Sequence, residues 1–297
     1  MTQTAEESRR IATAVAGRRG ARNVRQAGIG TEFVFFVADG VDGPEGYRVP
    51  RSAMFRTANN AGVAAARLQE QERSLMVWAA EQGVPSVRVQ DLIEVEGSPV
   101  LVVDVVPDDG SALDGRSFGR IIGLLHRAPV PRLAPVAQQG RAIAERIARR
   151  LTERHAALSR YGLAALPGEP RLAELVRAGS GPEVVTHLDL RRQNVRCRRG
   201  EVTALFDWSN ALLAPAALEL ARLTEYAEIA DNGLPLDDVL AGYREAGGQV
   251  ANDTEAWTVL RLDTSVMLAN VFDSVAPDQP LRDLFLDRSD QLARSIS

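Results

Sequence analysis

The fold of this chain is decided by the stretch THLDLRRQN, residues 186–194, and by the tripeptide FDW, residues 206–208, that follows it. Between the two lie a turn at Gly200 and the apolar run 202–206, which together predict a small β-hairpin. An apolar pair at residues 184–185 predicts a short strand that leads into the first stretch. The hairpin should therefore return the aspartate of FDW to the asparagine that ends THLDLRRQN.

Three oxygen-bearing side chains would then meet, namely those of Asp189, Asn194 and Asp207. Phosphoryl transfer needs such groups, because its catalysis consists of positioning a hydroxyl and neutralising the charge of the phosphates. We predict that Asp189 accepts the hydrogen bond of a substrate hydroxyl, and that Asn194 and Asp207 hold Mg²⁺ between phosphate oxygens. His187 is expected to brace the loop by hydrogen bonds. The structural alternative is an ordinary hairpin with a capping Asp and a turn Asn.

The motif HLDLRRQN followed by LFDW resembles the aminoglycoside phosphotransferase family, which has the protein-kinase-like fold. In the family the motif is more often His-Gly-Asp, and this chain has Leu188 in place of that Gly. The resemblance implies an α+β fold of two lobes. Residues 1–109 would form a small N-terminal lobe, with an antiparallel sheet and one or more helices, that ends in a hinge. Residues 110–297 would form a larger, mainly helical C-terminal lobe with the catalytic loop and the substrate pocket.

Composition limits the class of protein further. A chain of 297 residues with 45% hydrophobic residues is long enough to bury the cores of two lobes. The net charge of −4 argues against a nucleic-acid partner, and no apolar run approaches the length of a membrane span. The single cysteine, Cys197, excludes an internal disulfide and suits a reducing cytoplasm, where we expect the protein to act as a monomer or homodimer.

The chain contains no lysine, so that all 35 basic residues are arginines. This excludes a P-loop and a Schiff-base enzyme, since both require lysine. In a kinase-like fold, the cation that contacts the nucleotide phosphates must then be an arginine. The segment Tyr47-Arg48-Val49 resembles the family's third strand, which favours Arg48 over Arg51 for this role. A solvent-facing strand arginine is the alternative.

Two further elements of a nucleotide site are predicted before the hinge. Gly28 and Gly30 would allow a turn to lie close over phosphates, although a plain turn has the same pattern. A helix is predicted over residues 62–82, and the resemblance implies that Glu72 on this helix holds the phosphate-binding arginine. The alternative is that Glu70 and Glu72 are solvated surface charges.

The remaining pattern assigns strands to the N-terminal part and helices to the C-terminal part. Strands are expected at residues 33–38, 47–49, 86–89, 92–96 and 99–106. The last leads into the hinge, where the resemblance implies that Asp104, Val105 and Val106 contact the purine of ATP or GTP. Helices are predicted over residues 118–126, 137–161, 171–178, 216–230, 235–246, 255–275 and 281–296.

The acceptor is the least determined part of the prediction. In the family it usually lies between the catalytic loop and the late helices. Acidic and polar side chains there could line a pocket and attract a cationic antibiotic: Glu225, Glu228, Asp231, Asp263, Asn270 and Asp273. These acids could equally be ordinary surface charges. The expected substrate is a hydroxyl of an antibiotic of aminoglycoside, macrolide or nucleoside type, whose phosphorylation confers resistance. The alternatives are a metabolic sugar, amino-alcohol or nucleoside kinase, and a nucleotide-binding pseudokinase scaffold.

Overall fold

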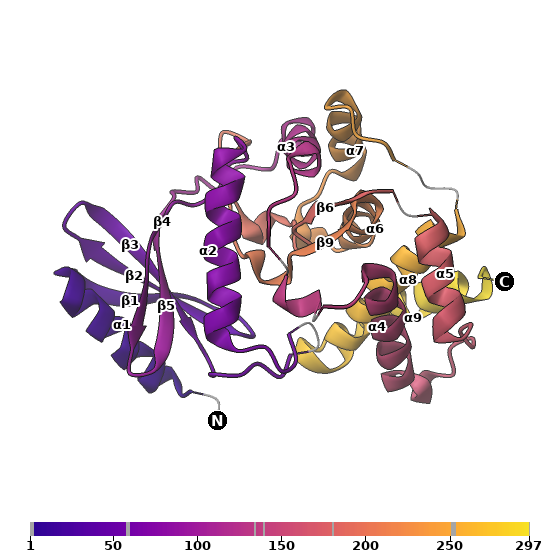
Figure 1. Cartoon of the computed structure of the whole chain (residues 1–297), viewed down its shortest axis with the longest axis horizontal. Coiled ribbons are helices and arrows are strands. Elements are labelled where there is room, and N and C mark those ends of the chain that lie inside the picture. Colours follow the sequence, from indigo (N-terminus) through magenta and orange to yellow (C-terminus); the bar gives the residue numbers. More distant parts are fainter. Residues whose placement is uncertain are drawn as a thin grey trace. The chain divides into compact units, whose positions relative to one another are not determined.

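The chain divides into two compact units in the computed structural model, which describes residues 3–57, 60–133, 135–138, 140–179, 181–250 and 254–296 (Figure 1). Unit 1 comprises Met1–Ala112, Pro131–Ala137 and Asn194–Ala211, and unit 2 comprises Leu113–Val130, Gln138–Gln193 and Leu212–Ser297. The segment Asn194–Ala211, which contains Asp207, therefore belongs to the same compact unit as the N-terminal part. The assignment of residues 110–297 to one lobe stays a prediction.

Unit 1 is built on a five-stranded antiparallel sheet with strand order β1-β2-β3-β5-β4. Its strands are β1 (Arg22–Ile29), β2 (Phe33–Gly40), β3 (Gly43–Pro50), β4 (Val89–Val95) and β5 (Ser98–Asp104). Strands were expected separately at residues 86–89 and 92–96. Instead, β4 is one strand with a register shift between Val89 and Asp91.

A helix covers each face of this sheet, α1 (Ala5–Arg19) on one and α2 (Ala65–Glu81) on the other (Figure 1). Because side chains alternate along a strand, neighbouring residues of β3 serve different faces. Tyr47 and Val49 are fully buried in the core that includes α1. Arg48 lies on the opposite face, toward α2. The register of β3 therefore points one cation to α2.

The sequence analysis did not predict α1, although its start carries a clear signal. Thr4 and Glu7 form a capping box, in which each side chain accepts a hydrogen bond from the other's backbone N–H. The helix ends at Gly20, which has a left-handed φ of 71°. Its apolar stripe is only Ile11, Ala12, Val15 and Ala16, which pack against the sheet.

The predicted hairpin after THLDLRRQN is confirmed in unit 1. Strands β7 (Val195–Arg198) and β8 (Glu201–Leu205) pair antiparallel. Arg199 and Gly200 join them with φ of 55° and 84°, as a two-residue hairpin turn with a type I′ backbone requires. The hairpin thus positions the residues that precede and follow it, Asn194 and Asp207.

Unit 2 is mainly helical and contains one two-stranded antiparallel ladder, β6 (Glu183–Thr186) with β9 (Leu212–Pro215). Its helices are α3 (Gly115–Arg127), α4 (Ile143–Ala157), α5 (Glu169–Gly179), α6 (Ala216–Tyr226), α7 (Leu236–Glu245), α8 (Glu255–Asn270) and α9 (Gln279–Arg294). A π-helical turn, Val271–Val275, extends α8. No helix of the described ranges is long and apolar enough to cross a membrane.

Two glycines explain local features of unit 2. A Cβ at Gly119 of α3 would lie 2.0 Å from the carbonyl oxygen of Val239 in α7, so the two helices approach more closely than any other residue would permit. The long helix expected over residues 137–161 is wrong, because the chain forms a 3₁₀ turn (Val136–Gln138) and α4 separately. Gly140 lies between them with φ of 69°, which an α-helix cannot accommodate.

Candidate active site

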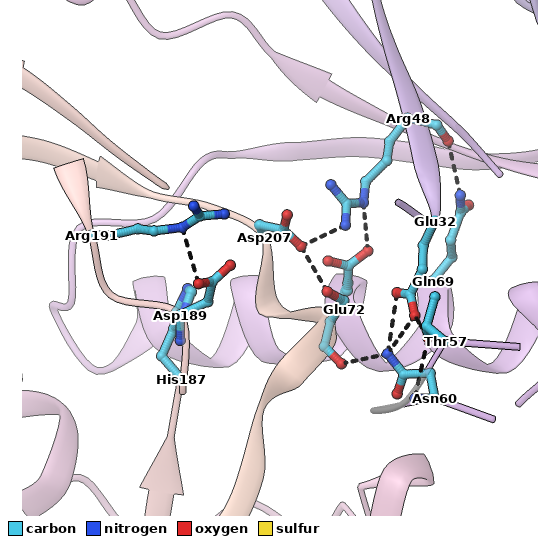
Figure 2. Close-up of polar contacts among 11 residues, drawn as sticks. Glu32, Arg48, Thr57, Asn60, Gln69, Glu72, His187, Asp189, Arg191 and Asp207 are labelled. Carbon is cyan, nitrogen blue, oxygen red and sulfur yellow. Dashed lines mark hydrogen bonds and ion pairs between the residues drawn. The ribbon is translucent and has the colours of Figure 1, made fainter. Parts of the chain in front are cut away.

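Arg48 is the centre of an ion-pair cluster in unit 1 (Figure 2). Its Nε donates to Glu72 Oε2 at 2.8 Å, and its Nη2 donates to Asp207 Oδ1 at 2.6 Å. The guanidinium lies 4.0 Å from the centre of the Phe33 ring, which adds a cation–π contact. Gln69 of α2 donates to the Arg48 carbonyl at 2.8 Å and so also fixes its backbone. The structure therefore brings together three residues singled out from sequence.

The electrostatics of this cluster favour a further cation. Burial raises the pKa of Glu72 to about 8, although Arg48 opposes this shift. Burial also opposes the charge of Arg48, but the carboxylates of Asp207 and Glu72 outweigh it and raise the arginine pKa. Burial raises the pKa of Glu32 too, and the nearby charge of Asp207 adds to the shift. Acids thus compete for Arg48 in a poorly solvated place, where an additional positive charge would be stabilising.

A hydrogen-bond network missed from sequence joins the β1–β2 turn to the segment after Asp207. The Asn60 amide donates to both carboxylate oxygens of Glu32, at 3.0 and 3.1 Å, and to the Ser209 carbonyl at 3.4 Å. Thr57 also donates to Glu32, and Ser209 Oγ donates to Asp207 Oδ1 at 2.8 Å. The available signal was the position of Glu32, directly after Gly-Ile-Gly-Thr.

Gly28 and Gly30 lie at the end of β1 and in the turn to β2. The N–H of Gly30 donates to the Phe33 carbonyl at 2.8 Å. A Cβ would meet only ordinary contacts, at 3.9 Å from Phe35 for Gly28 and at 3.5 Å from Phe33 for Gly30. The described fold therefore does not itself require glycine at these two positions.

Asn194 and Asp207 are the two candidate metal ligands, and the hairpin places them side by side. The backbone N–H of Phe206 donates to the Asn194 carbonyl at 3.2 Å. Asp207 has a left-handed backbone, with φ of 66° and ψ of 63°, which costs a non-glycine residue about 1 kcal/mol. Amide and carboxylate oxygens suit Mg²⁺, which takes few protein ligands and completes its shell with phosphate oxygens and water. Among the described residues, no group of three or more His, Cys, Asp or Glu could hold a metal ion.

The second candidate cluster lies in unit 2 around Asp189 (Figure 2). The carboxylate of Asp189 is 7% exposed and pairs with Arg191, whose Nε lies 3.1 Å from Oδ1. The hydroxyl of Tyr226 donates to the same oxygen at 3.2 Å. His187 accepts at Nδ1 from the Asp189 N–H at 3.3 Å, which agrees with the expected bracing role. Tyr226 and Arg191 therefore hold Asp189 at Oδ1.

Leu188 has a left-handed backbone, with φ of 61°. A residue with a Cβ is strained there, which accounts for glycine as the family's commoner residue. Hydrogen bonds hold Leu188 in this conformation, since its N–H donates to Glu219 Oε1 at 2.7 Å and its carbonyl accepts from Arg222 Nη1 at 2.7 Å. These hydrogen bonds thus offset the backbone strain that Leu188 introduces in place of the family's more common glycine.

Glu219 anchors the loop that carries Asp189, residues 187–193, which we name the Asp189 loop. Besides Leu188, it accepts from the His187 N–H at 2.8 Å, and its Oε2 lies 3.4 Å from Nε2 of His126. Burial by itself would raise the pKa of Glu219. The contact with His126, and next the contacts with His187, outweigh burial and lower this pKa. Glu219 therefore stays ionised. The sequence analysis did not predict this role of Glu219.

Unit 1 also tethers the expected hinge to the hairpin. Asp108 accepts from the Cys197 N–H at 2.9 Å and Asp109 from the Arg199 N–H at 2.7 Å. The carboxylate of Asp104 accepts hydrogen bonds from Arg88 and Gln90. Val106 lies two residues after the end of β5 and is partly exposed. Contacts of Asp104 and Val106 with a purine stay predictions.

The sequence pattern of the phosphotransferase enzyme family matches residues 23–260, most of the chain. The chain belongs to the phosphotransferase enzyme family. The resemblance inferred from sequence and the predicted enzyme class, a small-molecule phosphotransferase, are thereby confirmed. No curated protein matches the chain.

Solved structures share the fold of this phosphotransferase at low sequence identity. Macrolide 2′-phosphotransferase MphH from Brachybacterium faecium is 18% identical, covers 96% of this chain and 98% of its own, and has a TM-score of 0.56. Aminoglycoside phosphotransferase APH(4)-Ia is 14% identical, covers 97% and 98%, and has a TM-score of 0.66. Complexes of APH(4)-Ia variants contain hygromycin B with ADP or AMP-PNP. These likenesses confirm the predicted α+β, kinase-like fold.

The acids proposed to line an acceptor pocket in this phosphotransferase are mostly engaged with arginines. Asp263 is fully buried against Arg150 and Arg154, and the buried carboxylate of Glu225 bonds Arg261 at 2.6 Å. The remaining polar positions are also partnered: Glu228 with Arg288, Asp273 with Tyr161 and Arg160, and Asn270 with the Arg154 carbonyl. Asp231 is exposed and accepts from Gln193 through its backbone carbonyl. Their roles toward an acceptor stay predictions.

Proposed function

We propose that this phosphotransferase moves the γ-phosphate of ATP or GTP to a hydroxyl of a small molecule, with Asp189 as the catalytic base and Mg²⁺ bound by Asn194 and Asp207. The observation that carries the proposal is the arrangement of Arg48, Glu72 and Asp207, in which the candidate phosphate-binding cation pairs with the candidate metal-binding carboxylate. The nucleotide complexes of APH(4)-Ia variants support the choice of a nucleoside triphosphate.

In unit 1, the residues bind and orient the nucleotide. Arg48 would donate to phosphate oxygens, while Glu72 holds its Nε at 2.8 Å and so fixes its direction. Bound Mg²⁺ would neutralise charge on the transferred phosphate. Gly28 and Gly30 would let the β1–β2 turn lie over the phosphates, a role supported by the absence of any steric need for glycine in the protein itself.

In unit 2, Asp189 orients the acceptor. One of its oxygens would accept the hydrogen bond of the acceptor hydroxyl and take its proton as the phosphate is transferred. Tyr226 and Arg191 bond the other oxygen, Oδ1, and so restrict rotation of the carboxylate. Glu219 keeps the backbone of the loop in place.

The acceptor is proposed to be an antibiotic whose phosphorylation confers resistance, as the names of the macrolide and aminoglycoside phosphotransferases of this fold suggest. A metabolic kinase of a sugar, amino alcohol or nucleoside is the second candidate, and it is favoured by the arginine pairing of Asp263 and Glu225. The cytoplasm, which supplies ATP, GTP and Mg²⁺ and keeps Cys197 reduced, is the proposed location.

A mass-spectrometric screen tests the proposal. The protein is incubated with Mg²⁺ and ATP or GTP and with aminoglycosides, macrolides, nucleoside antibiotics and simple sugars, and each acceptor is examined for the gain of one phosphate. We expect a product that is lost in Asp189→Asn. Nucleotide binding without any product would instead favour the pseudokinase scaffold.

A binding measurement tests the metal site separately. Asp207→Ala should abolish the Mg²⁺-dependent part of nucleotide binding, because it removes the carboxylate ligand of the proposed pair. Ser209→Ala, which only removes a donor to Asp207, is the matched control and should retain it. Full metal dependence in Asp207→Ala would reject the assignment.

A further inference from the structure

The interior of unit 2 contains a group of arginines that gather around one carboxylate. Arg150 and Arg154 of α4 are each 7% exposed, Arg222 of α6 is 2% exposed, and Asp263 of α8 is fully buried. Nε of Arg150 donates to Asp263 Oδ1 at 2.9 Å, and Nη1 of Arg154 lies 3.5 Å from the same oxygen. We name these four residues the arginine cluster.

Arg222 is the member of the arginine cluster whose charge is least compensated. Its Nη1 donates to the Leu188 carbonyl at 2.7 Å, but its buried Nε and Nη2 have no hydrogen-bond partner among the residues that the structure describes. A buried charged donor without a partner costs several kcal/mol. Among the described residues, Arg222 is therefore a buried cation that bonds the Asp189 loop through Nη1 and has no acceptor for Nε and Nη2.

Neighbouring groups show the same excess of positive charge. Burial, and next the charge of Arg150, lower the pKa of Arg154 to about 9, with Arg222 adding to the shift. The carboxylates that share α6 with Arg222 are used elsewhere, Glu219 by the Asp189 loop and Glu225 by Arg261 and Arg288. Asp263 is the carboxylate with which Arg150 and Arg154 form ion pairs.

We propose that Arg222, together with Arg150 and Arg154, binds a small anion, a carboxylate or a phosphate. Such an anion would accept from Nε and Nη2 of Arg222 and would restore the charge balance of the arginine cluster. Because Arg222 also bonds the carbonyl of Leu188, the residue before Asp189, occupancy would be coupled to the loop that carries the proposed base.

The anion could come from two sources that share this chemistry. It could be a free inorganic anion, or it could be the anionic group of the acceptor, an assignment that rests on the proposed function. In the second case the substrate would be a hydroxy acid or a phosphorylated alcohol rather than a polycationic antibiotic. The arginine pairing of the nearby acids agrees with a substrate of this charge.

Isothermal titration calorimetry with inorganic phosphate, in the absence of nucleotide and Mg²⁺, tests the site without relying on turnover. Wild type should bind phosphate, and Arg222→Gln should lose on the order of tenfold to hundredfold in affinity, because a hydrogen bond to a charged partner is removed. Arg149→Gln, an exposed arginine of the same α4 that pairs with Glu153, is the control and should bind as wild type does.

Two more variants keep the result interpretable. Asp263→Asn should bind phosphate more tightly, because it removes the competing carboxylate. This change in affinity is opposite to that expected for Arg222→Gln, and it tests the proposal if Arg222→Gln does not fold. Arg48→Gln should leave the part of phosphate binding that depends on Arg222 unchanged. Loss of binding in Arg48→Gln alone would place the anion at the nucleotide site and overturn the proposal, as would the absence of phosphate binding in wild type.

Glycerate, a small hydroxy acid, distinguishes the two sources. Competition between glycerate and phosphate that depends on Arg222 would assign the site to the acceptor's own anionic group. Binding of phosphate without competition would assign it to a free anion. Failure of the phosphorylation screen would leave these binding results standing, so that the two proposals fail separately.

Discussion

In unit 1 the candidate functional side chains hold one another by charge, whereas in unit 2 the loop that carries Asp189 is held through its backbone. Arg48 is placed by the carboxylates of Glu72 and Asp207. The Asp189 loop is placed by hydrogen bonds from its N–H groups to Glu219 and from Arg222 to its carbonyl. Arginine and acid therefore pair with each other in unit 1, whereas in unit 2 they bind the backbone of the Asp189 loop.

The difference follows from what each part must do. Side-chain ion pairs can be exchanged when phosphates and a metal bring new charges. The paired side chains of Arg48 and Asp207 are themselves the candidate ligands of phosphate and metal. Backbone hydrogen bonds to a buried carboxylate are not exchanged, and they keep the position of a proton acceptor constant. We infer that the cluster around Arg48 rearranges on binding, while the Asp189 loop stays as it is. The following predictions test this contrast.

The largest effect is expected for Asp189→Asn. It should lower turnover by about 10²- to 10⁴-fold, because the variant cannot take the proton of the acceptor. Nucleotide affinity should change little, since the candidate phosphate-binding residues belong to unit 1. Single-turnover kinetics and nucleotide titration measure the two quantities, and unchanged turnover would remove Asp189 as the base.

A smaller but still large effect is expected for the stability of Arg48→Met. The loss of hydrogen bonds to two acids in a poorly solvated cluster should cost about 2–4 kcal/mol of unfolding free energy. Glu72→Gln should cost clearly less, because burial already raises the pKa of Glu72 to about 8 and a neutral amide resembles the protonated acid. Chemical denaturation measures both. Equal losses would mean that Glu72 is fully ionised in its pair with Arg48.

Glu219→Gln tests the backbone side of the contrast. The amide keeps only one acceptor oxygen for the N–H groups of His187 and Leu188, so that we expect a loss of about 1–3 kcal/mol. The strained backbone of Leu188 should then relax, which would lower turnover while nucleotide affinity is retained. Leu188→Gly, which removes the strain, should restore part of the stability in the double variant. No restoration would argue against strain at this position.

The smallest effect concerns the tether between the hinge and the hairpin. Hydrogen bonds from Ser111 and from the backbone of Arg199 lower the pKa of Asp109 to about 2, below its ordinary value of 3.8. A lowered pKa means that the contribution to stability is present above pH 4 and is lost as the pH falls toward 2. The difference in urea midpoint between wild type and Asp109→Asn should therefore narrow over this range. A constant difference would show that the charge of Asp109 is not involved.

Local patterns were predicted well where the evidence was itself local. The β7–β8 hairpin was predicted because Gly200 and the apolar run after it lie within a few residues of each other. The helix α1 was not predicted, although the capping box of Thr4 and Glu7 is a local signal for its start. The expected helix over residues 137–161 was too long, because Gly140 was not weighed as a helix-breaking residue.

Contacts between distant residues were predicted only where the family resemblance supplied them. The pairing of Arg48 with Glu72 was anticipated in this way, from the absence of lysine and the position of the third strand. The neutralisation of Asp263 and Glu225 was not anticipated, because their partners Arg150 and Arg261 lie on other parts of the chain. A pattern of acids on a helix does not reveal which arginines face it.

The sequence by itself determined the hairpin between Asn194 and Asp207, the choice of Asp189, Asn194 and Asp207 as candidate functional residues, and the fact that any phosphate-binding cation must be an arginine. These follow from residue identity and short-range spacing. Only the tertiary structure decided which of the many arginines form ion pairs, and which, like Arg222, are buried with N–H donors that have no acceptor among the described residues. The physical reason is that the value of a charge depends on its burial and its partners, and both are set by packing between segments far apart in the chain.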